Sequence, residues 1–133
     1  GAALPTIRRL AALLGDSPHV LDSGRLLEAL LAREAESPTY LHSGLALPHA
    51  RTASVSSIVI AAGTSPAGIP WGPAPQSARL VLLIGVPQDD VRGYLALLSR
   101  ISRHAQEPAW IDALLGLPHP AALCAALQKA LDA

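Results

Sequence analysis

The sequence has a single cysteine, Cys124, and a single lysine, Lys129. One cysteine excludes a disulfide framework and a cysteine-rich metal site, and it favours a reducing compartment such as the cytoplasm. One lysine near the end of the chain excludes a phosphate-binding loop, whose motif closes on Gly-Lys-Ser or Gly-Lys-Thr. The sequence also lacks a Gly-x-Gly-x-x-Gly and a Gly-x-Ser-x-Gly segment, which excludes the usual dinucleotide fingerprint and the hydrolase nucleophile elbow.

Methionine is absent as well, even at position 1. The sequence therefore begins after processing, at a residual tag, or inside a longer protein, and composition does not decide among these origins.

Neither an excess of charge nor a long apolar run is present. Ten Lys and Arg balance ten Asp and Glu, so no electrostatic footprint for nucleic acid is expected. The most apolar run, residues 80–86, is far shorter than the ~20 residues that span a bilayer, so direct membrane insertion is not expected. Half of the 133 residues are hydrophobic and 15% are charged, which excludes a disordered chain. The length fits one domain spanning residues 1–133.

The spacing of apolar residues predicts an α/β fold. Helical spacing and capping residues predict helices over 4–14, from Asp22 or Ser23 to Pro38, after the pair Asp89-Asp90, and over 108–115 and 120–131. Strands are predicted over 57–62 and 79–86, whereas residues 63–76, rich in Gly and Pro, read as a loop or a turn-bound edge. Since the second strand is apolar on both faces, we expect a layered sandwich, a mixed β-sheet flanked by helices on both faces.

Two charged residues turn toward the apolar side of the second predicted helix. On the helical wheel, Glu34 falls near the centre of a leucine stripe and Arg33 falls at its edge. Charged groups that face a core require partners. A salt bridge, an Arg stem lying along the apolar surface, or a functional site would each explain them.

His49 is the candidate reactive residue. It follows Pro48 at the end of an apolar, strand-like segment, where the proline fixes the backbone and presents the imidazole rigidly. Histidine has an ordinary pKa near ~6.5, so much of it is neutral at cell pH and can act as a nucleophile. A Pro-His pair without function is nevertheless common.

His42 lies seven residues before His49, and an odd spacing puts the two on opposite faces of a regular strand. A bulge at Gly44 would bring them together, but a metal site is not the expected outcome.

The segment from Gly44 to Arg51, Gly-Leu-Ala-Leu-Pro-His-Ala-Arg, resembles the phosphorylation-site motif of enzyme IIA domains. These are the fructose/mannitol-type domains of the bacterial sugar phosphotransferase system, including the nitrogen-regulatory branch. Arg33-Glu34 and Thr39 precede the motif at the family's spacing. Later blocks are also similar to the family, namely residues 68–71, 80–87 and 94–99, so the resemblance covers nearly the whole chain.

The resemblance implies that His49 accepts a phosphoryl group from the histidine-containing phosphocarrier protein. His49 would then pass the group to a cysteine or histidine of a IIB domain, or hold it as a regulatory mark. Arg33 would offer the phosphoryl oxygens a planar, permanently charged fork. Because the donor is a protein phosphohistidine, no cofactor and no metal bound by this chain is expected.

The sequence departs from the family at two positions. Tyr94 stands where the family usually has a second histidine, which is thought to bond to the phosphoryl group. A tyrosine donates one hydrogen bond through its hydroxyl but carries no positive charge at neutral pH. It would face His49, or else fill the edge of the core beside Leu97 and Leu98. His42 stands where glycine is common, as a residue that borders the site or, as we favour, a solvated loop residue.

The sequence supports three alternative hypotheses about function. The first is a phosphoryl-carrier domain that works on His49, in sugar transport or in nitrogen regulation. The second is a regulatory IIA-like module that acts by docking to a target protein, a reading that the loss of the second histidine favours. The third, a small-ligand-binding α/β domain, depends only on the Gly/Pro-rich region and on the tendency of crevices to form at strand ends. The composition is compatible with a homodimer, but it locates no interface.

Overall fold

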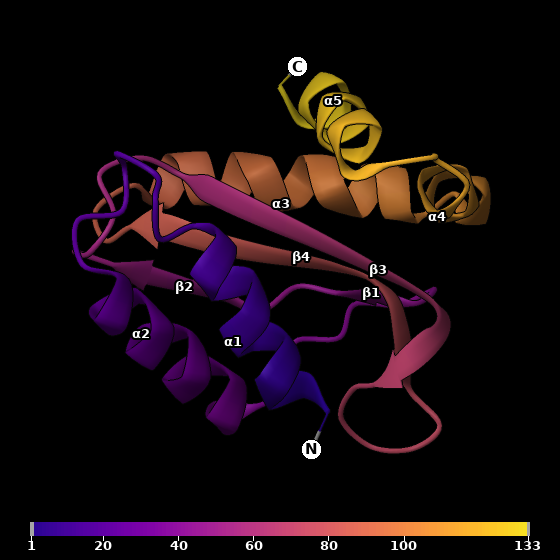
Figure 1. The fold of residues 1–133 in the computed structure, drawn as a ribbon, viewed down its shortest axis with the longest axis horizontal. Coiled ribbons are helices and arrows are strands. Elements are labelled where there is room, and N and C mark those ends of the chain that lie inside the picture. The colour runs from indigo at the N-terminus through magenta and orange to yellow at the C-terminus, as the bar shows by residue number, and fades with distance from the viewer. Residues whose placement is uncertain (1, 133) are drawn as a thin grey trace.

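The computed structural model describes residues 2–132. Its helices and strands, in chain order, are α1 (Ala3–Leu13), α2 (Ser23–Glu36), β1 (Leu45–Ala46), β2 (His49–Thr52), β3 (Val59–Pro70), β4 (Ser77–Pro87), α3 (Val91–Ala105), α4 (Pro108–Leu115) and α5 (Pro120–Leu131). Figure 1 shows the sheet between two helical layers, with α1 and α2 on one side and α3, α4 and α5 on the other.

The sheet is mixed and is built around β4. The short strands β1 and β2 both pair with β4 in parallel, β1 near its start and β2 along its end, with His49 opposite Ile84. β3 pairs with β4 in the antiparallel sense, Val59 opposite Gly85. Because β3 already occupies one edge of β4, the two parallel strands lie along the other edge, and β3 forms the outer edge of the sheet.

The alternation of β4 side chains explains why its sequence is apolar throughout. Val81 and Leu83 belong to the core between the sheet and α1 and α2. Leu82 and Ile84 belong to the core under α3, α4 and α5. Successive residues of a strand point to opposite faces, so the two-layer prediction made from this strand is confirmed.

Helix boundaries follow the predicted capping residues. The side chain of Asp22 accepts a hydrogen bond from the Arg25 N–H and begins α2, and that of Asp90 accepts one from the Gly93 N–H at 2.9 Å and begins α3. Both contacts satisfy backbone donors that the first turn of a helix leaves free. Within residues 2–132, no helix is both long enough and apolar enough to cross a membrane.

Of the two alternatives predicted for residues 63–76, a loop or a turn-bound edge, the edge is confirmed for the first half and the loop is wrong there. β3 continues to Pro70, with a register irregularity between Thr64 and Ile69, and the chain turns only after that. Pro66 and Pro70 are tolerated because proline lacks only the N–H that an outer edge strand leaves unpaired. Trp71, which follows Pro70, is completely buried in the core between the sheet and helices α1 and α2.

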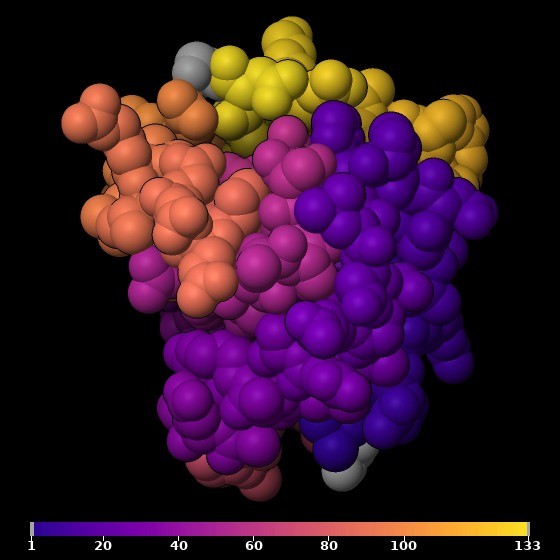
Figure 2. All heavy atoms as spheres, turned by 90° about the vertical axis from the view of Figure 1, so that its left-hand side faces the viewer, coloured from indigo at the N-terminus to yellow at the C-terminus, as the bar shows by residue number. Residues whose placement is uncertain are grey.

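The carboxyl ends of β2 and β4 reach the same side of the molecule (Figure 1). On this side the start of α3, in orange, lies against the magenta residues that lead into β3, and α2, in purple, lies below them (Figure 2). Residues from α2, β2 and α3 are thereby brought within reach of one another.

Candidate functional site

His49 begins β2 rather than ending the preceding strand, as its sequence position had suggested. Its Nδ1 lies 2.7 Å from the carbonyl oxygen of Leu47. A carbonyl oxygen only accepts, so Nδ1 carries the hydrogen and donates it, and in the neutral ring Nε2 carries the lone pair. The backbone contact therefore leaves the lone pair on Nε2.

Tyr94 meets that atom. It lies in the first turn of α3, and its hydroxyl is 3.1 Å from Nε2 of His49, with the two ring centroids 5.5 Å apart and the planes inclined by 34°. Since Nε2 has no hydrogen, the tyrosine hydroxyl is the donor. Tyr94 also packs, with Leu97 and Leu98, in the core under helices α3, α4 and α5. Both expected placements of Tyr94, facing His49 and filling the core edge, are therefore realised by one side chain.

Arg33 reaches the same region from the last turn of α2. It lines a cleft of about 270 Å³ together with His49, the loop before β1 and α3, through Leu98. One guanidinium nitrogen, Nη1, donates to the Ser37 carbonyl oxygen at 3.2 Å. This contact steadies the stem and uses one of the five N–H donors of the guanidinium, which leaves the others for an anion.

Glu34 is buried, and neither a salt bridge nor a snorkelling stem explains it. Its carboxylate accepts hydrogen bonds from the backbone N–H and the hydroxyl of Thr39, and from the indole N–H of Trp71 at 3.1 Å. Thr39 in turn accepts from the backbone N–H of Leu47, at 2.7 Å. The residue whose carbonyl orients His49 is thus anchored, through Thr39, to α2.

The surroundings of His49 favour its neutral form. Burial of the ring is the main cause, and it lowers the pKa of His49 below the ordinary value of 6.5. The hydrogen bond to Leu47 raises the pKa, the positive charge of Arg33 lowers it, and the negative charge of Glu34 raises it by the least. The net lowering keeps the Nε2 lone pair available at neutral pH.

Arg51 is the residue of this region that sequence reasoning missed. Its guanidinium carbon lies 5.9 Å from the centroid of the Tyr94 ring. The signal was its spacing, since residues i and i+2 of a strand share a face and Arg51 follows His49 by two.

Comparison with known proteins decides the family. The family model described as "Phosphoenolpyruvate-dependent sugar phosphotransferase system, EIIA 2" matches residues 5–130. The chain belongs to this EIIA family. The match takes in every residue of the site, from Arg33 to Tyr94.

Two curated relatives are fructose-specific components of this system. The EIIABC component of Bacillus subtilis is 35% identical over 97 residues, which are 72% of this EIIA chain and 15% of that protein. The EIIA component of Haloferax volcanii is 36% identical over 98 residues, which are 73% of this chain and 64% of that protein. The aligned region is therefore less than two thirds of the length of either relative.

Solved structures share the fold of this EIIA chain. The nitrogen regulatory protein IIA-Ntr of Neisseria meningitidis superposes with a TM-score of 0.83 at 23% identity, covering 96% of this chain and 87% of that one. IIA mannitol of Escherichia coli, solved in complex with phosphorylated IIB mannitol, superposes with a TM-score of 0.76 at 20% identity, covering 99% and 88%.

His42 does not join the site of this EIIA domain. It is exposed, its Nδ1 lies 3.1 Å from the hydroxyl of Ser43, and it is not among the residues that line the cleft at His49. The interpretation of His42 as a solvated loop residue is confirmed. Within residues 2–132, no three His, Cys, Asp or Glu side chains are grouped so that they could hold a metal ion.

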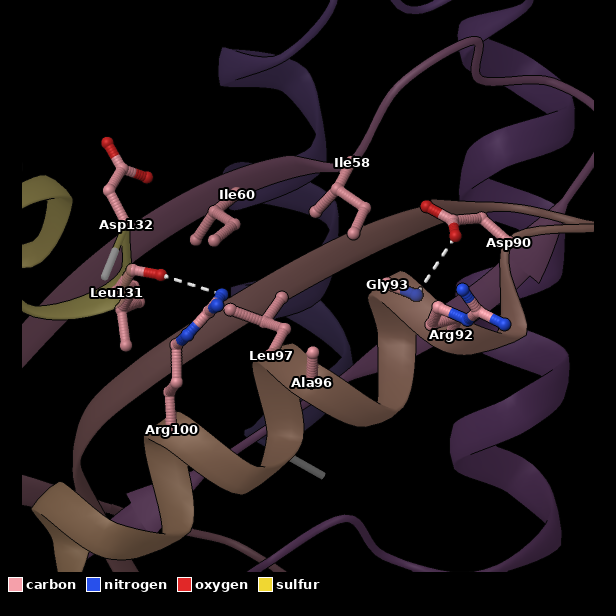
Figure 3. Close-up of a pocket in the computed structure, with 10 residues that line it drawn as sticks. All are labelled: Ile58, Ile60, Asp90, Arg92, Gly93, Ala96, Leu97, Arg100, Leu131 and Asp132. Atoms are coloured by element: carbon pink, nitrogen blue, oxygen red, sulfur yellow. Dashed lines mark hydrogen bonds between the residues drawn. The ribbon is translucent and has the colours of Figure 1, made fainter.

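Another hollow of the domain lies away from His49. It measures about 560 Å³ and is lined on the opposite side of α3 by residues such as Ile58, Ile60 and Leu97. Figure 3 shows Arg100 reaching across it to the Leu131 carbonyl oxygen, at 3.3 Å. Its lining contains none of His49, Arg33 and Tyr94. The small-ligand hypothesis stays a prediction, and the first half of the Gly/Pro-rich region on which it depends belongs to β3.

The lowered pKa of His49 gives a first prediction. In a titration followed by NMR of the imidazole C–H protons, the midpoint of His49 is expected below the ordinary histidine value of about 6.5. The unfolded chain then binds the proton more tightly than the folded chain does. The free energy of unfolding should therefore fall as the pH drops from about 6.5 through the lowered pKa, with no further loss from this group below it.

A His49→Gln variant is the control, because it should flatten this part of the stability profile without changing the rest. A midpoint at or above 6.5 would contradict the prediction.

Proposed function

We propose that residues 1–133 form one EIIA domain that acts as a phosphoryl carrier, in the cytoplasm, with His49 as the transient phosphohistidine. The donor is the phosphohistidine of a histidine-containing phosphocarrier protein, and the acceptor is a IIB domain. The observation that carries the proposal is the orientation of His49, which lines the cleft and whose Nδ1–H is bound to Leu47, so that Nε2 keeps its lone pair.

The geometry supports a direct transfer between nitrogens. The Nε2 lone pair forms the new N–P bond while the N–P bond of the donor breaks and returns an electron pair to the donor imidazole. The ring of His49 becomes positively charged as the bond forms, and the Nδ1–H bond to Leu47 then becomes the stronger, charge-assisted kind. Transfer to the IIB domain reverses these steps.

Two further side chains take roles in this proposal. Phosphoryl transfer depends mainly on positioning and on stabilising charge over the equatorial oxygens. Arg33 supplies a fixed positive charge with donors in a plane. The hydroxyl of Tyr94, which meets Nε2 before transfer, turns to donate to a phosphoryl oxygen once the lone pair is used.

Incubation with purified phosphorylated phosphocarrier protein tests the proposal. We expect intact-mass analysis to show one added phosphoryl group that is labile in acid and stable in base. The group should leave when a IIB domain is added. Because the donor is a protein rather than a nucleotide, both transfers should proceed in EDTA. A chain that stays unmodified would refute the carrier function.

A regulatory docking module is the second candidate, and Tyr94 is the observation that favours it. The phenol hydroxyl bonds to the lone pair that must attack, and it brings no charge to the product. Phosphoryl transfer at such a site is expected to be slow. Slow transfer suits a regulatory domain, in which a target protein recognises the phosphorylation state.

Replacing Tyr94 by His should speed phosphoryl acceptance. An imidazolium brings a charge-assisted hydrogen bond, worth about twice a neutral one, and each ~1.4 kcal/mol gained at the transition state gives roughly tenfold in rate. Tyr94→Phe should slow acceptance modestly, by roughly two- to fivefold, because the lost donor is partly offset by the freed lone pair. Single-turnover rates from the phosphorylated phosphocarrier measure both effects.

Leu95→His places an imidazole on the exposed side of the same helix and serves as the control. Equal rates for wild type, Tyr94→His and Tyr94→Phe would show that Tyr94 only fills the core edge, and would favour the regulatory module.

A further inference from the structure

The ring of Tyr94 contacts two side chains of one strand. His49 packs against it with the centroids 5.5 Å apart, and the guanidinium of Arg51 lies 5.9 Å from its centroid. A guanidinium within about 6 Å of an aromatic centroid is attracted by the negative face of the ring. Tyr94 thus has a contact with Arg51 that is separate from its packing against the core.

The strand geometry explains why both contacts fall on one ring. In β2, His49 and Arg51 point to the same face, while the intervening Ala50 is buried in the core on the other face. The first turn of α3 passes that face at Tyr94.

Arg51 is not committed elsewhere among the described residues. Its side chain is exposed, and within residues 2–132 no carboxylate lies within 4.0 Å of its guanidinium. By contrast, Arg79 and Arg25 are paired with Asp112 and Asp22. Arg51 lines a hollow together with Glu36 and Asp89, but neither carboxylate forms a salt bridge with it.

We propose that Arg51 is a positioning residue, whose guanidinium holds the Tyr94 ring so that the hydroxyl meets Nε2 of His49. The role of this contact in transfer rests on the proposed function. Before transfer the fixed hydroxyl donates to the lone pair of Nε2. After transfer the same ring position keeps the hydroxyl within reach of the phosphoryl oxygens.

A double-mutant cycle followed by NMR titration of His49 tests the positioning. The charged or polar groups around the ring are Arg33 and Glu34 from α2, Tyr94 from α3 and Arg51 from its own strand. A hydrogen bond donated to unprotonated Nε2 favours the neutral ring, so its loss moves the titration midpoint to higher pH. We expect this movement in Tyr94→Phe and in Arg51→Met.

The decisive arm is Arg51→Met in the Tyr94→Phe background, where no further movement is expected, because the hydroxyl that Arg51 positions is already gone. Arg8→Met, which removes an exposed arginine of α1, is the matched charge control and should leave the midpoint unchanged. Arg51→Lys keeps a cation but loses the planar group, and it should lie between wild type and Arg51→Met.

Two results would overturn the proposal. Equal movement with and without the Tyr94 hydroxyl would show that Arg51 acts on His49 only as a charge, and no movement in Arg51→Met would show that it does not hold the ring. In transfer assays, Arg51→Met should slow acceptance by no more than Tyr94→Phe does, and the double variant should match Tyr94→Phe. The titration needs no phosphocarrier, so it separates failure of the positioning from failure of the carrier function.

Discussion

A folded His49→Ala variant should gain no phosphoryl group from the phosphorylated phosphocarrier protein, whereas the wild-type chain gains one. His49 lines the cleft, and the Leu47 carbonyl fixes its ring through Nδ1, so that Nε2 keeps its lone pair. The loss should be complete rather than partial, because neither Tyr94 nor Arg33 offers a neutral nitrogen at that position. Intact-mass analysis after incubation, with acid and base treatment of the adduct, measures it.

His42→Ala is the matched control. It removes an exposed imidazole that lies outside the cleft, so modification should proceed as in the wild-type chain. Circular dichroism of both variants should match the wild type, because His49 is only half-buried and lies at the start of its strand. An acid-labile adduct that persists in folded His49→Ala would place the phosphoryl group on another residue and would remove the basis of the carrier proposal.

Local signals predicted most of the scaffold around this site. Asp22 and Asp90 cap α2 and α3 as expected, because a short carboxylate before an apolar helical pattern satisfies free N–H groups through contacts within one turn. The apolar run of β4 predicted both helical layers, since each face of a buried strand needs a cover. These features depend on neighbours in the sequence or on one strand alone.

The features that the sequence left open or that were missed depend on pairing across the chain. The extension of β3 to Pro70 is decided by its antiparallel partner, Ser77 to Leu80, which overrides the turn preference of glycine and proline. The partners of Glu34 include Trp71, which is far away in sequence. The contact of Arg51 with Tyr94 likewise joins a strand to a helix, and neither residue's local pattern encodes the other.

Arg33→Lys should slow phosphoryl acceptance by roughly 5- to 150-fold although the charge is kept. The guanidinium donates to Ser37 through one nitrogen and still presents further N–H groups in one plane to the cleft, whereas an ammonium is a point charge that matches two phosphoryl oxygens poorly. Losing a hydrogen bond to a charged group costs about 1–3 kcal/mol, which converts to that range of rates. Single-turnover transfer from the phosphorylated phosphocarrier measures it.

Two comparisons distinguish the planar donor geometry of Arg33 from its charge and from a general effect on helix α2. Arg25→Lys changes an exposed arginine at the other end of the same helix and should leave the rate unchanged. The positive charge of Arg33 lowers the pKa of His49, so Arg33→Gln should raise that pKa while Arg33→Lys should leave it near the wild-type value. A slow Arg33→Lys variant with an unchanged His49 titration would therefore locate the defect in the geometry of the donors. Unchanged transfer in Arg33→Ala would instead reduce Arg33 to its bond with Ser37 at the end of α2, and the cleft would then lack the fixed cation on which the carrier mechanism depends.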